Sequence, residues 1–202
     1  MKWLAIAIGV ALLFSSFAKS DAQSQTKTIR IWDACDPDSF NAVVGPGTCI
    51  SGHHGKTLFS DFVGELQKDQ IAGGWRFNPL LNTSAGVFRR VRLHLNSGDQ
   101  TVIENMGGET HTFTRVEDFA GGFVAFLNPL TGNPVPAPEC AQMVNGKLVP
   151  QPQSATNEFV EAGKTEAGPT AGSSALPLGI SHWQCCIHPW MRLDIVVHEP
   201  GN

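Results

Sequence analysis

The stretch SHWQCCIHPWMRLDIVVH, Ser181–His198, holds two strand-like segments joined by a loop that carries two cysteines, a histidine and a methionine. Apolar residues alternate with other residues in both segments, which predicts two strands that each bury one face. Neighbouring residues of a strand point to opposite faces, so we expect Cys185 and Cys186 to have different surroundings and different roles. A disulfide between the two is disfavoured, because it would strain the peptide bond that joins them.

The same period-two pattern recurs upstream, in short segments separated by turn residues such as Ser97-Gly98-Asp99. Closely spaced strands with many turns predict an all-β protein, a sandwich or a barrel. One helix is expected over residues 57–70, with Thr57 as its N-cap, whereas residues 33–56 and the Pro/Gly-rich residues 128–155 are predicted to be loops. The expected strands are Thr28–Trp32, Val91–Leu95, Val102–Glu104, Thr110–Val116, Gly122–Leu127, Glu158–Ala162, Ile180–Cys185 and Met191–His198.

The first residues have the pattern of a secretory signal peptide: Lys2, a short apolar run over residues 3–14, and small residues up to Ala22. An exported protein meets oxidising conditions, where cysteines are paired or bound to metal. The chain has five cysteines, an odd number, so one of them is free or is a ligand. The formal net charge of -4 and the lack of basic runs give no indication of nucleic-acid binding. The pair His53-His54 in a glycine-rich turn is typical of solvated loop.

Cys185, His188 and Met191 are spaced C-x2-H-x2-M and offer a thiolate, an imidazole and a thioether on one short loop. Upstream, in ENMGGETHTFT, His111 stands at a turn that enters a strand and offers a second imidazole. Two imidazole nitrogens, one thiolate and a weak axial thioether form the ligand set of a blue-copper site. The ordinary structural alternatives are a disulfide for Cys185, a turn for His188 and core packing for Met191.

The segments LNSGDQTVIENMGGETHTF and CCIHPWMRLDIVV together resemble the cupredoxins. In that family a strand pair with a Gly-Asp turn leads to the first histidine, and the other three ligands lie on a loop between the last two strands. The resemblance covers residues 87–199, and the ligand loop is of the very short kind, similar to amicyanin. It implies a cupredoxin-like Greek-key β-sandwich or barrel with an N-terminal helix-containing extension and a long insertion.

Carried over to this chain, the resemblance implies that His111, Cys185 and His188 are the equatorial ligands of one type 1 copper ion and Met191 its axial ligand. The residue after the first histidine is often Asn in the family, where it ties the two ligand loops together. Here it is Thr112, and the sequence leaves open whether its hydroxyl makes such a bond.

With one cysteine assigned to the metal, four remain for two disulfides: Cys35, Cys49, Cys140 and Cys186. Three pairings are open, and a free Cys186 is a further alternative. We favour Cys35–Cys49, which would close a local turn-rich loop. Cys140–Cys186 would then tie the long insertion to the strand that leads into the ligand loop.

We therefore expect a signal peptide over residues 1–22, an N-terminal extension with one packed helix over residues 23–86, and a cupredoxin-like copper-binding domain over residues 87–202. A metal enclosed by four protein ligands has no open position for a substrate, which favours an electron carrier over an enzyme. The signal peptide places this carrier in the periplasm or outside the cell. The alternatives are a copper carrier that delivers metal to another protein and a metal-free interaction module on the same scaffold.

Partner recognition is expected at an apolar rim around His188, which we place near the surface. Met106, Pro189 and Trp190 would form this rim and dock redox proteins transiently, although Trp190 could equally serve packing alone. No stable membrane span is expected once the signal peptide is removed.

Overall fold

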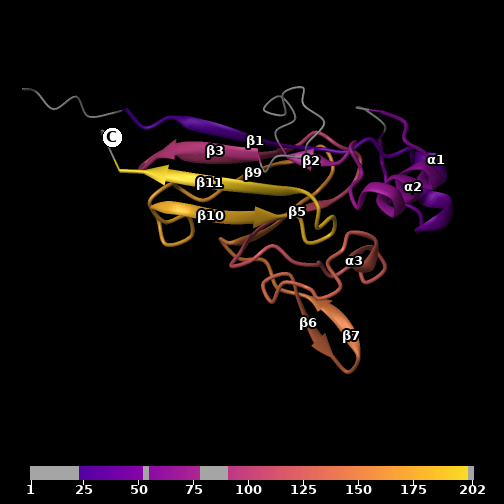
Figure 1. Ribbon diagram of the computed structural model, residues 1–202. Helices are drawn as coiled ribbons and strands as arrows, with labels where there is room; N and C mark the ends of the chain where they lie inside the picture. Colours follow the sequence, from indigo (N-terminus) through magenta and orange to yellow (C-terminus); the bar gives the residue numbers. More distant parts are fainter. Residues whose placement is uncertain (1–22, 52–54, 78–90, 200–202) are drawn as a thin grey trace, which may run out of the picture.

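The computed structural model describes residues 23–51, 55–77 and 91–199, and these form a mainly β protein with short helices at one end (Figure 1). The strands are β1 Thr26–Trp32, β2 Arg76–Phe77, β3 Val91–Asn96, β4 Gln100–Asn105, β5 His111–Val116, β6 Ala141–Val144, β7 Lys147–Pro150, β8 Asn157–Val160, β9 Thr165–Ala167, β10 Gly179–Gln184 and β11 Arg192–His198. One sheet has the order β2-β1-β4-β9 and the other β3-β11-β10-β5-β8, while β6 and β7 pair separately. The all-β prediction is confirmed.

The two larger sheets bury their alternate, apolar positions. In β1, Ile29 and Ile31 are buried while Arg30 between them is partly exposed, as period-two alternation requires. Parallel pairing sets Ile29 beside Ile103 of β4. The second sheet contributes the stacked rings of Phe113 and Trp183, whose centroids lie 4.4 Å apart. Each such buried side chain contributes about 1.5–3 kcal/mol to folding.

The strand pairing of the second sheet shapes the cysteine-rich loop. β10 and β11 are antiparallel, and their last paired residues are Gln184 and Arg192. The seven residues of 185–191 therefore form the connection between them. β5 pairs with the other side of β10, so His111 begins a strand of the same sheet. This loop lies at the end of the sandwich that carries the helices (Figure 1).

A helical cap, defined here as residues 35–51 and 55–75, covers that end of the sandwich. It contains α1 Pro37–Val43 and α2 Phe59–Asp69. The prediction of loop over residues 33–56 is wrong at α1, because Asp36 accepts the Ser39 N–H at 2.9 Å and Pro37 opens the first turn, two strong helix-start signals. The predicted helix over residues 57–70 is α2, but Leu58 stands at its N-cap in place of Thr57.

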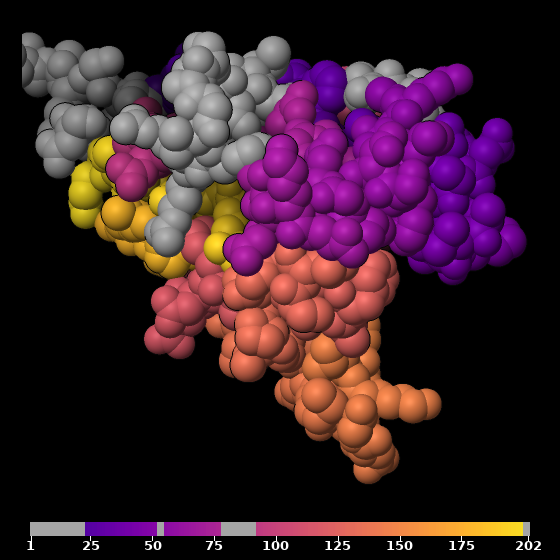
Figure 2. All heavy atoms as spheres, turned by 45° about the vertical axis from the view of Figure 1, so that its right-hand side comes forward, coloured from indigo at the N-terminus to yellow at the C-terminus, as the bar shows by residue number. Residues whose placement is uncertain are grey.

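Aromatic side chains pack against one another within the cap and join it to the cysteine-rich loop. The ring of Phe62 on α2 lies 4.6 Å from that of Trp75 and 5.7 Å from that of Trp190 on the cysteine-rich loop. Phe40 of α1 stacks on Trp75 at 5.7 Å. The cap also meets the segment before the β6–β7 hairpin, where Gln70 lies beside Gly132 (Figure 2).

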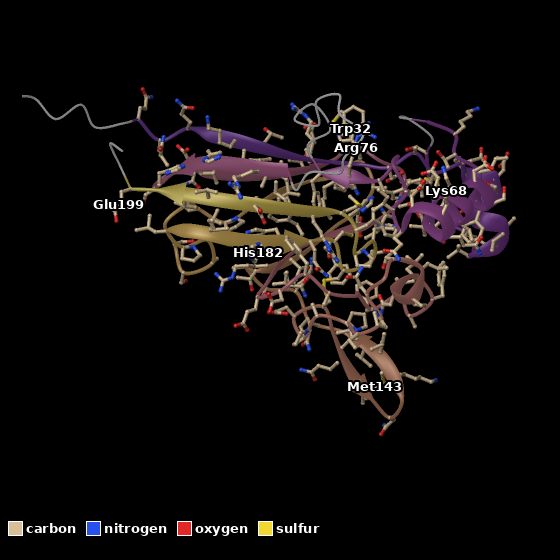
Figure 3. All side chains as sticks on the ribbon, viewed as in Figure 1. Trp32, Lys68, Arg76, Met143, His182 and Glu199 are labelled. Carbon is tan, nitrogen blue, oxygen red and sulfur yellow. A yellow bond between two sulfur atoms is a disulfide. The ribbon has the colours of Figure 1, made fainter. Side chains whose placement is uncertain are left out.

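Two predictions for the middle of the chain are wrong. Residues 128–155 contain the β6–β7 hairpin, because Asn145 and Gly146 both adopt positive φ, the requirement of a tight two-residue hairpin turn. The hairpin projects from the body with Met143 exposed on it (Figure 3). The expected strand Gly122–Leu127 is not formed, and the short helix α3 Leu127–Leu130 begins at its end. Gly122 instead approaches the backbone of Cys186 so closely that a Cβ would lie 1.7 Å from its carbonyl oxygen.

The expected signal peptide, the pair His53-His54 and the expected domain boundary at 86/87 lie outside the described residues. The extension predicted over residues 23–86 contains β1 and β2, which are strands of the first sheet, in addition to the two helices of the cap. In the part of the chain that the structure describes, no helix has both the length and the apolar character to cross a membrane.

The fit of the cap predicts opposite effects for two glycine substitutions. A Cβ on Gly108 would lie 1.9 Å from the Ser51 carbonyl oxygen and 2.9 Å from Cys35 Sγ, so Gly108→Ala is expected to destabilise the protein by about 1–3 kcal/mol or more. Gly64, on α2, has open space, and Gly64→Ala is expected to stabilise by about 0.5–1 kcal/mol. Urea unfolding measures both. Equal effects of the two substitutions would contradict this packing.

Candidate metal centre

Three side chains from two distant segments meet at the capped end of the sandwich. Cys185 Sγ lies 3.6 Å from His111 Nδ1 and 3.7 Å from His188 Nδ1, and the two nitrogens are 3.2 Å apart. The side chains are buried, with 0%, 0% and 3% of the surface of Cys185, His111 and His188 exposed. The structure therefore brings together three of the four residues that the sequence predicts as ligands, with one donor atom each.

The triangle of these atoms fits a metal ion. Its centre lies about 2 Å from each atom, close to the roughly 2.0–2.3 Å of first-row metal bonds to imidazole nitrogen and thiolate sulfur. A set of one thiolate and two imidazoles suits copper, and zinc accepts the same donors.

Met191 lies on the same loop and is buried. Its backbone closes the loop: its carbonyl oxygen accepts the Cys185 N–H at 3.1 Å, and its N–H donates to the His188 carbonyl oxygen at 2.9 Å. These two bonds fix the backbone at three predicted ligands. The role of Met191 as axial ligand remains a prediction.

Thr112 links the two ligand segments. Its hydroxyl oxygen accepts the N–H of Cys186 at 2.7 Å, and its own N–H donates to Cys185 Sγ at 3.3 Å. The bond that the sequence left open is therefore present. Because His111 precedes Thr112 and Cys185 precedes Cys186, the two bonds hold the first histidine against the cysteine-bearing loop.

The adjacent cysteines have different surroundings. Cys185 belongs to the main core and is the free thiol among the described cysteines, whereas Cys186 lies in a separate small cluster with Val116 and Ala137. Cys186 forms a disulfide with Cys140, and Cys35 forms one with Cys49; these are the pairs favoured above. The Cys140–Cys186 disulfide ties the segment before the β6–β7 hairpin to the ligand loop. The Cys35–Cys49 disulfide joins the two ends of the segment that contains α1.

Asp33, at the end of β1, is a polar residue of the site that the sequence analysis missed. Its Oδ2 lies 3.0 Å from His111 Nε2, the nitrogen that faces away from Cys185, and accepts the Glu109 N–H at 3.0 Å. Its Oδ1 accepts the Gly108 N–H at 2.9 Å. The close approach needs Gly107, where a Cβ would lie 1.8 Å from Asp33 Oδ2. Two local signals existed in the sequence, an Asp directly after a predicted strand and the pair Gly107-Gly108 before His111. Only the pairing of β1 with β4 shows that Asp33 and this glycine pair lie side by side.

Glu109 is a second buried carboxylate, on the side of the other histidine. Its Oε2 lies 3.6 Å from His188 Nε2 and accepts the indole N–H of Trp75 at 2.5 Å. Burial raises the pKa of Glu109 above its usual value. Each of the two histidines therefore has a buried carboxyl group beside the nitrogen that faces away from the thiol.

The electrostatics of the cluster favour the thiolate. Burial alone would raise the pKa of the Cys185 thiol, but hydrogen bonds and positive charge from His111 and His188 lower it well below its usual value. Burial would likewise lower the pKa of His111, but Asp33 and Cys185 raise it to about 10. The site is thus built to hold positive charge beside a thiolate, and a metal cation supplies such charge.

A second group of potential ligand atoms, from Asp33, Cys35 and Glu109, lies beside the first. Cys35 is bonded to Cys49, so it has no thiolate to offer. The two carboxyl groups face the histidines of the first group instead.

The expectation that His188 lies near the surface is wrong, because the cap covers it. The rings of Trp75 and Trp190 lie 6.4 and 5.2 Å from its ring. Trp190 is half-buried and donates its indole N–H to the Ala72 carbonyl oxygen, and Pro189 is buried. Met106 is half-buried as well. Trp190 therefore faces the chain's own cap, and the docking role of this rim stays a prediction.

Comparison with known proteins finds no matching family model and no matching curated protein. Among solved structures, the chain is similar to a purple cupredoxin from Nitrosopumilus maritimus, with 15% identity and a TM-score of 0.34 over 67% of this chain and 92% of that one. A mutant of amicyanin in the Cu(I) state matches with 15% identity and a TM-score of 0.28, over 57% and 76% of the two chains. Overlap at this level carries no weight in assigning the site.

The bond between the ligand segments predicts the effect of removing one hydroxyl. Thr112→Val leaves the buried Cys186 N–H without its acceptor, so unfolding is expected to become easier by about 1–3 kcal/mol. Thr112→Ser keeps the hydroxyl and serves as the matched control. Chemical unfolding of the metal-free protein measures both. A valine variant that is as stable as the serine variant would contradict the linking role.

Proposed function

We propose that this chain is an exported mononuclear type 1 copper protein that carries single electrons between redox partners. The observation that supports this most strongly is the buried convergence of Cys185 Sγ with the Nδ1 atoms of His111 and His188. These three residues would hold the ion, and Met191 would be a fourth, weaker ligand. A copper ion bound here supplies reversible one-electron chemistry.

The protein contributes a fixed ligand geometry. The backbone bonds of Met191 close the loop, Thr112 joins it to β5, and Asp33 holds the far side of the His111 ring. Ligands held this firmly change position little when the charge of the centre changes, which suits fast electron transfer. The N–H of Thr112, directed at the sulfur, stabilises the thiolate.

The burial of the three ligands supports electron transfer over the alternatives. A metal enzyme needs an open position for its substrate. A copper donor needs ligands that a receiving protein can reach. Here His188 is buried with Trp75 of the cap beside it, so both activities would require the cap to move. Electrons, in contrast, can cross packed side chains.

The two disulfides support an oxidising location, and therefore export to the periplasm or the medium. The expected signal peptide over residues 1–22 would provide the route. The partners proposed for this protein are redox proteins that bind transiently.

The proposal predicts that the colour of the copper-loaded protein depends on one sulfur. Cys185→Ser is expected to abolish the intense visible band that arises from charge transfer between thiolate and copper. His94→Gln replaces an exposed histidine outside the site and is expected to keep the band. Circular dichroism checks that both variants fold. A persisting band in the serine variant would exclude Cys185 as the ligand.

The burial of the site also predicts slow metal exchange. Copper-loaded protein is expected to go through repeated reduction and oxidation with full recovery of the visible band. In the presence of a Cu(I) chelator, the reduced protein is expected to lose its copper far more slowly than it is reoxidised. Rapid loss of copper to the chelator, with poor recovery of the band, would favour the copper-donor alternative.

A further inference from the structure

We propose that Asp33 is a positioning residue of the copper centre: its carboxylate holds His111 with Nδ1 directed at the metal, and its buried charge favours Cu(II) over Cu(I). The inference rests on the proposed function and deepens it. It assigns a redox role to a residue of the N-terminal part of the chain, outside the segments that carry the family resemblance.

The first step is orientation. Asp33 Oδ2 lies 3.0 Å from His111 Nε2, so in the neutral ring the proton is held on Nε2 and the lone pair on Nδ1 is left for the metal. His111 Nδ1 faces Cys185 Sγ at 3.6 Å. The opposite tautomer would direct an N–H at the metal and lose the bond to Asp33. The carboxylate therefore selects the form of the ring that can bind.

The second step is the need for a carboxylate rather than an amide. Donors face both oxygens of Asp33: Oδ2 meets His111 Nε2 and the Glu109 N–H, and Oδ1 meets the N–H groups of Gly108 and Cys35, the last at 3.4 Å. An asparagine in this position would direct its own N–H group at one of these pairs of donors. Asp33→Asn thus keeps the size of the side chain but loses acceptors on one side as well as the charge.

The third step is charge. Asp33 is 2% exposed, and a charge in such surroundings acts more strongly than one in water. A single imidazole ring separates it from the triangle of ligand atoms. A negative charge at this place stabilises the doubly charged ion more than the singly charged one. We expect it to lower the reduction potential of the centre.

Another buried pair provides a matched control. Asp194 is also 2% exposed, and its Oδ1 lies 2.9 Å from His182 Nδ1 on β10. Asp194→Asn therefore removes a buried carboxylate bonded to a histidine of the same sheet, but a histidine that is not among the proposed ligands (His182 is labelled in Figure 3). General loss of stability from a buried Asp-to-Asn change should appear in both variants.

The experiment measures the affinity for Cu(II) and Cu(I) and the reduction potential in the wild type, Asp33→Asn and Asp194→Asn. Asp33→Asn is expected to weaken Cu(II) binding about 10–100-fold and Cu(I) binding less, so that the potential rises. Asp194→Asn is expected to leave all three values unchanged. Equal losses for both copper ions in Asp33→Asn, or equal behaviour of the two variants, would overturn the redox role.

A measurement on the wild type keeps the inference testable if Asp33→Asn fails to fold. Nitrogen-15 NMR of the diamagnetic Cu(I) form should show a slowly exchanging proton on His111 Nε2. A proton on Nδ1, or a freely exchanging one on Nε2, would overturn the positioning role. If the wild type binds no copper through Cys185, the proposed function and this inference fall together; if it does and Asp33→Asn behaves as the wild type, the inference alone fails.

Discussion

The buried Cys185 thiolate limits how the residues around it can be arranged. Burying an ionised sulfur is costly unless donors or positive charge surround it. Here Cys185 Sγ accepts the Thr112 N–H and lies 3.6 and 3.7 Å from the Nδ1 atoms of His111 and His188. The same contacts that make the thiolate tolerable also give it the ligand geometry of a metal centre. The copper binding that we propose therefore depends on the same cluster of atoms that makes the buried thiolate tolerable.

The N-terminal part of the chain belongs to this centre. Asp33, directly after β1, contacts the first histidine, and Trp75 of the cap lies beside the second. Gly107 and Gly108, just before His111, leave room for Asp33 and for Cys35 of the Cys35–Cys49 disulfide to lie close to this loop. An electron carrier of the kind that we propose, with both histidines buried, would exchange electrons through its own protein layer.

The sequence predicted the features that repeat along the chain or stand close together in it. The period-two strands, the helix α2 and the C-x2-H-x2-M loop were of this kind, and a resemblance to the cupredoxins placed His111. Asp33 was missed because its partner His111 is 78 residues away and the parallel pairing of β1 with β4 has no local signal. The burial of His188 was missed for the same reason, since Trp75 lies beside it only through the packing of the cap. The hairpin around Asn145-Gly146 did have a local signal, a dipeptide typical of tight turns.

Ligation of copper by Cys185 is tested by the electron paramagnetic resonance spectrum of the wild-type protein loaded with one equivalent of Cu(II), recorded together with its optical spectrum. We expect an unusually small parallel copper hyperfine splitting and an intense visible band, because unpaired spin would spread onto the sulfur of Cys185. An ordinary wide splitting with a faint band would show that copper binds elsewhere and not through this thiolate.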